Sequence, residues 1–151
     1  MKHAALDHDG IAALIPHQGA MCLLDRLEHC DEAGIVCMAS GHRDPAHPLR
    51  TASGLLSPCA IEYAAQAMAL HGALLGRDAG TPPRPGYLAS VRGVRLHRLR
   101  LDDLDGELRV EARREAGNAR QVLYGFAVTH AGEAIAEGRA AVVLDTPLTL
   151  P

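Results

Sequence analysis

Residues 58–75 constrain the fold more than any other part of the chain. Every residue there is apolar or small except Glu62, Tyr63, Gln66 and His71, and Glu62 carries the only formal charge. These polar side chains make the stretch a poor membrane span, which needs about 20 consecutive apolar residues. A helix that is hydrophobic nearly all round is normally buried in a protein core. We therefore predict one long, buried central helix and no association with a membrane.

The residues at its two ends predict where this helix begins and stops. Ser57 followed by Pro58 is typical of a helix start. The serine side chain can accept a bond from a free backbone N–H group, and proline at the first helical position needs no such bond. Gly76 predicts the end of the helix, because glycine readily adopts the left-handed conformation found there.

Apolar runs on both sides of this helix predict β-strands. A short helix at residues 7–14 precedes two runs, 21–30 and 34–40, that predict a hairpin. Turn residues separate four later segments, which predict an antiparallel meander: residues 87–101, 107–115, 120–130 and 133–145. The element order predicts an α+β fold and a single domain over residues 1–151. Because the edges of an open sheet need cover, we expect a dimer that joins two sheets.

Composition narrows the functional class. The formal net charge of -3 argues against nucleic-acid binding, which usually needs a basic domain. The four cysteines show no C-x-x-C spacing, and the N-terminus lacks a basic region followed by an apolar run, so we expect a reduced, cytoplasmic protein. Among the nine histidines only His42 and His47 lie close together on one element, a proline-containing loop. We therefore predict no metal site and no cofactor.

Glu62 and Gln66 are the candidate catalytic pair of the central helix. Burial disfavours the charged form of a carboxyl group and so raises its pKa towards values useful for proton transfer. The i, i+4 spacing places the Gln66 amide on the same helix face, where it can hold the Glu62 carboxyl in one rotamer. The alternative is that Glu62 is partly exposed and complements the helix dipole or pairs with an arginine.

Two segments resemble those of a known family, the hot-dog-fold 3-hydroxyacyl-acyl carrier protein dehydratases of fatty-acid synthesis. Residues 15–27 read Ile-Pro-His-Gln-Gly-Ala-Met-Cys-Leu-Leu-Asp-Arg-Leu and are similar to the family's opening signature. Residues 60–68 read Ala-Ile-Glu-Tyr-Ala-Ala-Gln-Ala-Met and are similar to its central helix. The resemblance implies a hot-dog fold, in which an antiparallel sheet wraps around one long helix. The pattern most resembles the divergent branch encoded with aryl polyene synthesis.

The chain departs from that family in the loop before the helix. The family's catalytic histidine stands in an Asn-Gly-His-Phe-Pro motif, with Pro-Gly just before the helix, and neither motif is intact in residues 40–58. The loop offers His42, which we expect to be exposed, and His47, which lies nearer to the family's register. His47 is therefore the candidate base, with a plain loop histidine as the alternative. For His17, in the opening signature, we expect a structural role or one at the substrate entrance.

The resemblance implies dehydration of a 3-hydroxyacyl thioester. Glu62 would deliver a proton to the departing hydroxyl, Gln66 would orient it, and His47 would take the proton from C2. Backbone N–H groups at the start of the helix would bind the thioester carbonyl, because they lack partners within the helix. The candidates for this role are Ser57, Cys59 and Ala60.

Arginines cluster in residues 84–100, where no acidic residue stands among them: Arg84, Arg92, Arg95, Arg98 and Arg100. Arg92 and Arg95 are candidates for binding the phosphate of phosphopantetheine and the acidic acyl carrier protein through charge complementarity. Solvated strand faces explain the cluster nearly as well.

Two other functions fit the same sequence. An acyl thioesterase of the same fold would hydrolyse the thioester with an activated water molecule instead of eliminating water. A non-catalytic subunit would bind the acyl carrier protein and complete a heterodimer with a competent dehydratase, which the altered histidine loop favours. The sequence leaves open the acyl chain length, the choice between carrier protein and coenzyme A, and the choice between homodimer and heterodimer.

Overall fold

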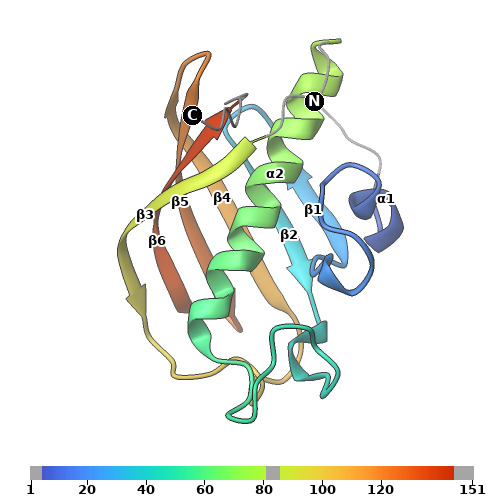
Figure 1. Ribbon diagram of the computed structural model, residues 1–151, viewed down its shortest axis with the longest axis vertical. Helices are drawn as coiled ribbons and strands as arrows, with labels where there is room; N and C mark the ends of the chain where they lie inside the picture. The colour runs from blue at the N-terminus through green and yellow to red at the C-terminus, as the bar shows by residue number, and fades with distance from the viewer. Residues whose placement is uncertain (1–4, 81–85, 145–151) are drawn as a thin grey trace, which may run out of the picture.

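The computed structural model describes residues 5–80 and 86–144. A six-stranded antiparallel sheet curves around one long helix, α2 (Figure 1). The elements are α1 (His8–Ala12), β1 (Arg26–Cys30), β2 (Gly34–Ala39), α2 (Ala60–Asp78), β3 (Gly86–Leu96), β4 (Leu108–Gly117), β5 (Gln121–His130) and β6 (Glu133–Leu144). Short 3-10 turns at Gly19–Met21, Gly41–Arg43 and Ser57–Cys59 shape the loops. This is the α+β, hot-dog architecture that the sequence predicts.

The strands follow the order β1-β2-β4-β5-β6-β3. The β1-β2 hairpin and the β4-β5-β6 meander are as predicted. The prediction is wrong for β3, which pairs with β6 at the far edge of the sheet and not with β4. The reason is that residues 97–107 do not turn tightly but cross beneath the start of α2. There the Ser57 N–H donates to the Leu99 carbonyl (3.0 Å), and the Leu101 N–H donates to the Leu55 carbonyl (2.8 Å).

The ends of α2 differ from the predicted ones. Ser57 makes no capping bond: it is buried inside a 3-10 turn that runs directly into α2, and Leu56 occupies the N-cap position of that turn. The helix passes through Gly76 and continues to Asp78. Gly80, with a φ of 68°, supplies the left-handed residue just beyond the helix. A glycine was thus correctly predicted at the end of the helix, but the predicted position is one turn too early.

One face of α2 fills the concave side of the sheet. Its buried side chains are Ala60, Tyr63, Ala64, Gln66, Ala67, Met68, Leu70, His71 and Leu74. The opposite face carries Glu62 among small and apolar residues, all of them partly or fully exposed: Ile61, Ala65, Ala69, Gly72 and Ala73. We call this face the open stripe of α2, because a spacing of three or four residues aligns its members on one side. The expectation that the helix is buried all round is therefore wrong for the single chain.

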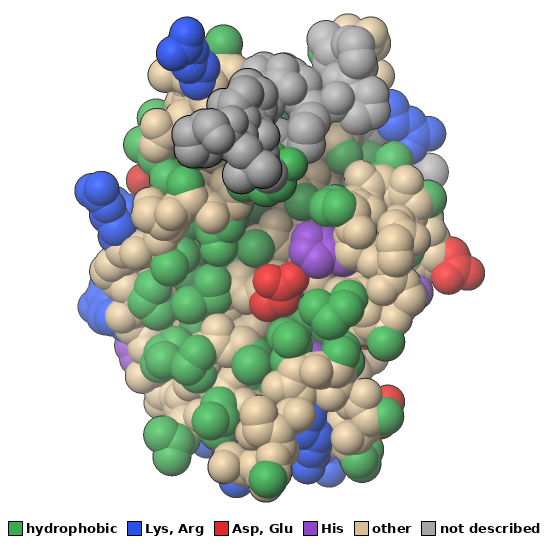
Figure 2. All heavy atoms as spheres, in the orientation of Figure 1, with side chains coloured by type: hydrophobic (Ala, Val, Ile, Leu, Met, Phe, Trp, Pro, Cys, Tyr) green, Lys and Arg blue, Asp and Glu red, His purple; other side chains and the backbone are tan. Residues whose placement is uncertain are grey.

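The two edges of the sheet differ. The edge of β1 is covered, because the Leu27 N–H donates to the Leu6 carbonyl (2.9 Å) and Asp7 forms a bridge with Arg26. The edge of β3 has no strand beside it within the described residues. Exposed apolar side chains mark this strand: Tyr87, Leu88, Val91 and Leu96. Figure 2 shows apolar side chains gathered on the β3 side of the molecule, next to the surface of α2.

None of the helices in the described part of the chain is long and apolar enough to cross a membrane. The core under α2 consists mainly of aliphatic side chains and includes three buried free thiols, those of Cys22, Cys30 and Cys37. Burial raises the pKa of all three, to about 11 for Cys30 and to about 12 for Cys37. These thiols are therefore poor nucleophiles, since the thiolate is the reactive form.

Candidate active site

Glu62 lies in the first turn of α2, on the open stripe. Its side chain is 32% exposed, so the carboxylate is at the surface of the single chain and not deep in the core. One oxygen, Oε1, has two contacts: Gln66 Nε2 donates to it at 3.1 Å, and His17 Nε2 lies 3.1 Å away. Figure 2 shows an acidic side chain and a histidine in the middle of this face, among apolar side chains. The paired residue is thus a histidine, and not an arginine.

Gln66 connects Glu62 to the loop that follows α1. Its side chain is fully buried, and its Oε1 accepts the Leu23 N–H at 2.8 Å. Its Nε2 donates to the Met21 carbonyl at 2.7 Å as well as to Glu62. The backbone contacts fix which end of the amide faces the carboxylate, because only the nitrogen can donate. The predicted i, i+4 contact is present, and Gln66 also holds the loop that carries His17.

His17 is the histidine that reaches Glu62. It lies between α1 and the Gly19–Met21 turn, and its neighbour Gln18 fastens this segment by donating to the carbonyls of Ala12 (2.9 Å) and Ile15 (3.1 Å). His17 Nδ1 is buried without a hydrogen-bond partner. Sequence reasoning placed His17 at the substrate entrance or in a structural role and missed this contact. The only signal for it was the Ile-Pro-His opening signature.

His47 does not contact Glu62. The Leu49 N–H donates to His47 Nδ1 (3.1 Å), so the proton of a neutral ring is on Nε2, which donates to the Tyr63 hydroxyl (3.0 Å). Both ring nitrogens are therefore occupied, and burial lowers the pKa of His47. His42, expected to be exposed, is fully buried, with Nε2 2.8 Å from the Leu104 carbonyl. Both histidines of this loop hold it to the rest of the fold.

The backbone groups at the start of α2 are already paired. The Ser57 N–H donates to Leu99, and the Cys59 N–H donates to the Leu56 carbonyl (3.0 Å). The Ala60 N–H contacts the carbonyls of Ser57 and Pro58. The prediction that these N–H groups are free for a thioester carbonyl is therefore wrong, because the 3-10 turn and the crossing segment use them. The Cys59 thiol is half-buried, and burial raises its pKa.

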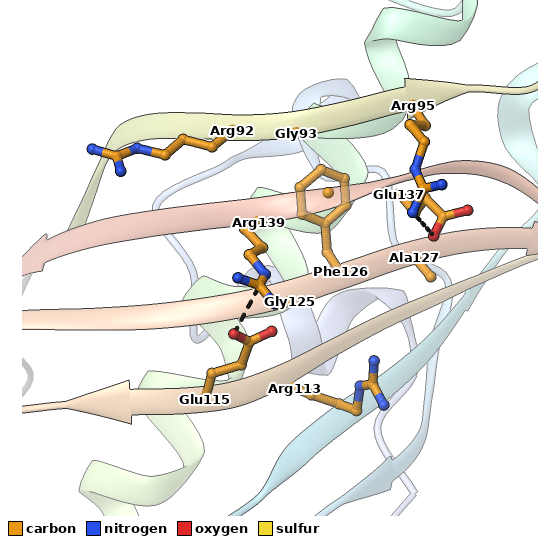
Figure 3. Close-up of a pocket in the computed structure, with 11 residues that line it drawn as sticks. Arg92, Gly93, Arg95, Arg113, Glu115, Gly125, Phe126, Ala127, Glu137 and Arg139 are labelled. Carbon is orange, nitrogen blue, oxygen red and sulfur yellow. Dashed lines mark ion pairs between the residues drawn. The ribbon is translucent and has the colours of Figure 1, made fainter.

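Arg92 and Arg95 lie on the face of the sheet opposite α2. They line a hollow there together with side chains of β4, β5 and β6, as Figure 3 shows. Glu62 is on the other side of the same sheet, so one chain does not bring these arginines to the carboxylate. Arg84, the first arginine of the cluster, lies outside the described residues. Within the described residues, no group of three His, Cys, Asp or Glu side chains is placed to hold a metal ion.

A family model for ApeP-like proteins, described as ApeP dehydratase, matches residues 10–148. The chain belongs to the ApeP-like dehydratase family. This agrees with the resemblance to hot-dog dehydratases, and with their aryl-polyene branch, that the Ile-Pro-His and Glu-Tyr-Ala-Ala-Gln segments indicate. No curated protein matches the sequence.

Solved structures show the same fold at low sequence identity. A chain of the dehydratase heterocomplex ApeI:P from Xenorhabdus doucetiae has a TM-score of 0.81 and 19% identity, covering 90% of this chain and 91% of that one. A mutant thioesterase from Staphylococcus aureus has a TM-score of 0.61 and 14% identity, with 80% and 92% covered. A hypothetical thioesterase with coenzyme A from Streptococcus pneumoniae has values of 0.55 and 11%, with 78% and 83% covered. ApeP-like dehydratases thus share their architecture with thioesterases.

Proposed function

We propose that the chain eliminates water from 3-hydroxyacyl thioesters of acyl carrier protein, with Glu62 as the group that transfers the proton. The observation that carries this proposal is the contact of Glu62 with both His17 and Gln66 on the open stripe of α2. A carboxylate held in one orientation beside an apolar surface is placed to exchange a proton with a bound acyl chain. Membership of a dehydratase family supports the choice of reaction.

The two oxygens of Glu62 have different surroundings, which suggests that one is held in place while the other exchanges the proton. Oε1 is held by Gln66 and His17, whereas Oε2 has no hydrogen-bond partner within the described residues. In the proposed reaction Oε2 takes a proton from C2, the C–H electrons form the C2–C3 double bond, and the C3–O bond breaks. Glu62 then returns the proton to the departing hydroxyl, which leaves as water. The products are an enoyl thioester and water, and the carboxylate is regenerated.

His17 would position the Glu62 carboxylate for this reaction, because its Nε2 lies 3.1 Å from Oε1 and does not engage Oε2. A protonated His17 forms an ion pair with the carboxylate, and this pair becomes a hydrogen bond to a neutral acid once the C2 proton has moved. This role differs from the one predicted for His47, which was to take the C2 proton; in the proposed reaction Glu62 takes that proton itself.

The test is incubation of the purified chain with a 3-hydroxyacyl pantetheine thioester and with the same acyl group on a carrier protein, followed by mass spectrometry. We expect an enoyl thioester from both substrates. Glu62→Gln should abolish water loss, since an amide cannot take the C2 proton. Glu28→Gln, which changes an exposed carboxylate on β1, is the matched control and should leave the rate unchanged.

The other products separate the competing functions. Release of free acid, lost in Glu62→Gln, would assign a thioesterase. An unchanged substrate would contradict an active dehydratase and assign a non-catalytic subunit. A specific observation supports this last function: both ring nitrogens of His47, the nearest match to the family's catalytic histidine, are occupied by Leu49 and Tyr63.

We also infer that the β3 edge binds a second hot-dog subunit, either another copy or a related chain. An uncovered edge strand presents a row of unpaired backbone groups, and the exposed Leu88, Val91 and Leu96 add apolar area to it. The similar protein from Xenorhabdus doucetiae is part of a heterocomplex. Native mass spectrometry of the chain alone and with a candidate partner tests this, and Val91→Lys should weaken the assembly.

A further inference from the structure

Side chains from two helices hold three consecutive residues of the loop that follows α1. Gln66 of α2 donates to the Met21 carbonyl (2.7 Å) and accepts the Leu23 N–H (2.8 Å). His8 of α1 contacts the residue between them, with Nε2 3.0 Å from the Cys22 carbonyl. This stretch of the loop is therefore held from α1 as well as from α2.

His8 is the donor in its contact with the loop. A carbonyl oxygen accepts and cannot donate, so Nε2 carries a proton, as it does in one neutral tautomer and in the imidazolium ion. The other ring nitrogen, Nδ1, lies 3.5 Å from a carboxylate oxygen of Asp9, whose side chain is 98% exposed. Cys22 is buried, so water would not readily replace a lost donor at its carbonyl.

His8 projects from a helix that is fastened to the rest of the fold. α1 has only five residues and is too short to be stable without tertiary contacts. The Ile11 side chain is fully buried in the core, and the Asp7 side chain caps α1 by accepting the Gly10 N–H (2.9 Å). Asp7 also forms a bridge with Arg26 at the start of β1, and Figure 1 shows α1 beside that strand. The donor on His8 is therefore fixed relative to the sheet.

Both groups that contact Glu62 Oε1 depend on the stretch that His8 holds. Gln66 Nε2 donates to the Met21 carbonyl and also to Oε1. His17 lies just before a 3-10 turn that the Cys22 N–H closes. A shift of this stretch would therefore disturb both contacts of Oε1.

We propose that His8 is a positioning residue for the Glu62 carboxylate and acts through the Cys22 carbonyl. This role rests on the function proposed above, because it matters for catalysis only where Glu62 transfers the proton. Without the donor on His8, a buried carbonyl loses its partner and the loop moves to find another one. The carboxylate is then no longer held in the geometry that proton transfer needs.

The activity test compares two replacements of His8. His8→Leu removes the donor, whereas His8→Gln keeps an N–H group close to the place of Nε2. With the 3-hydroxyacyl pantetheine thioester, His8→Leu should lower kcat about tenfold and change KM by less than about twofold, because the carboxylate is misplaced while the substrate surface is intact. His8→Gln should restore most of the kcat. His29→Leu, which changes an exposed histidine of β1, is the matched control and should leave kcat unchanged.

Nuclear magnetic resonance of the Gln66 side-chain amide gives a readout that needs no turnover. Its nitrogen donates to two acceptors, and the replacement Gln66→Glu identifies its signals by their loss. His8→Leu should shift these signals in the folded chain, whereas His8→Gln and His29→Leu should leave them in place. A role confined to stability would lower the midpoint of urea denaturation without moving the signals.

Three results would overturn the proposed role of His8. They are unmoved amide signals in His8→Leu, an unchanged kcat in that variant, and a His8→Gln variant that is as slow as His8→Leu. Absence of turnover in the unaltered chain would instead contradict the proposed function. The amide signals would then decide alone whether His8 positions the carboxylate.

Discussion

The two loops before α2 place their histidines in different surroundings. In the loop of residues 13–25, His17 directs Nε2 at Glu62. In the loop of residues 40–56, His42 and His47 are both buried against other parts of the fold. The second loop contains the better sequence match to a catalytic histidine, yet the first one supplies the contact with the carboxylate.

This difference shows that the partners of the ring nitrogens decide what a histidine can do. A general base must have a nitrogen free to accept a proton and must lie within reach of the reacting group. His47 accepts from Leu49 and donates to Tyr63, so it has no free nitrogen. A histidine with these bonds is a structural residue, whatever its place in the sequence.

The largest expected effect comes from making the same substitution, histidine to asparagine, in each of the two loops. His17→Asn should lower the rate of water loss by about a hundredfold or more with little loss of stability, because it removes the partner of Glu62. His47→Asn should keep the rate and cost about 1–3 kcal/mol of stability, because it disturbs a buried hydrogen-bonded ring. Rate assays and urea denaturation of both variants measure this. The reverse pattern would restore His47 as the catalytic histidine.

Gln66→Leu should affect both stability and rate. It leaves the Leu23 N–H and the Met21 carbonyl without their partner, which should cost about 2 kcal/mol of the free energy of unfolding. It also frees the loop that holds His17, so the rate should fall in the fraction that remains folded. Gln18→Leu removes two bonds of the same loop at an exposed position and should cost less stability, because the carbonyls of Ala12 and Ile15 can bond to water instead. An unchanged midpoint of urea denaturation in Gln66→Leu would contradict the role given to this amide.

Gly54→Ala should destabilise the His47 loop and leave the His17 site intact. Gly54 has a φ of 99°, and an added Cβ would collide with the Arg100 guanidinium and the Asp102 carboxylate. The expected loss is about 1–2 kcal/mol of stability with an unchanged rate in the folded fraction. Gly41→Ala, in the same loop, is the control because a Cβ there meets open space. Equal melting temperatures for both variants would refute this account of Gly54.

The smallest effect is a dependence of stability on pH that comes from the His47 loop. Burial lowers the pKa of His42 and of His47 below the unfolded value of about 6.5. The unfolded chain therefore binds more protons in the range below 6.5, and stability falls as the pH drops from there through the lowered values. Urea denaturation at pH 7.5, 6.5 and 5.5 should show this decline. His42→Asn should reduce its slope, and an equal slope would show that other groups cause it.

Local signals in the sequence predicted the elements that are formed by local contacts. The β1-β2 hairpin and the β4-β5-β6 meander are each joined by a turn that the sequence marks with glycine, asparagine or aspartate. The position of β3 was not predictable in this way. It depends on a segment that pairs with residues 55–57, far away in the sequence, and only the folded chain reveals that contact.

The same distinction between local and distant contacts applies to the candidate site. Glu62 and Gln66 are one helical turn apart, so their contact followed from helix geometry alone. The meeting of His17 with Glu62 depends on a loop path fixed by Gln18 and Gln66, for which the sequence has no periodic signal. The N–H groups near Ser57 and Cys59 were predicted to be free because a helix start was treated in isolation. In the fold a crossing segment and a 3-10 turn occupy them.

The unequal edges of the sheet have a consequence for how such a chain is produced in a cell. β1 is shielded by residues before α1, whereas β3 offers eleven residues of strand to any other strand that it meets. A chain whose β3 edge is left uncovered would therefore be prone to self-association and to capture by quality-control proteases. Where the β3 edge binds a different subunit, as proposed above, we expect the yield of soluble protein to rise when the two chains are produced together.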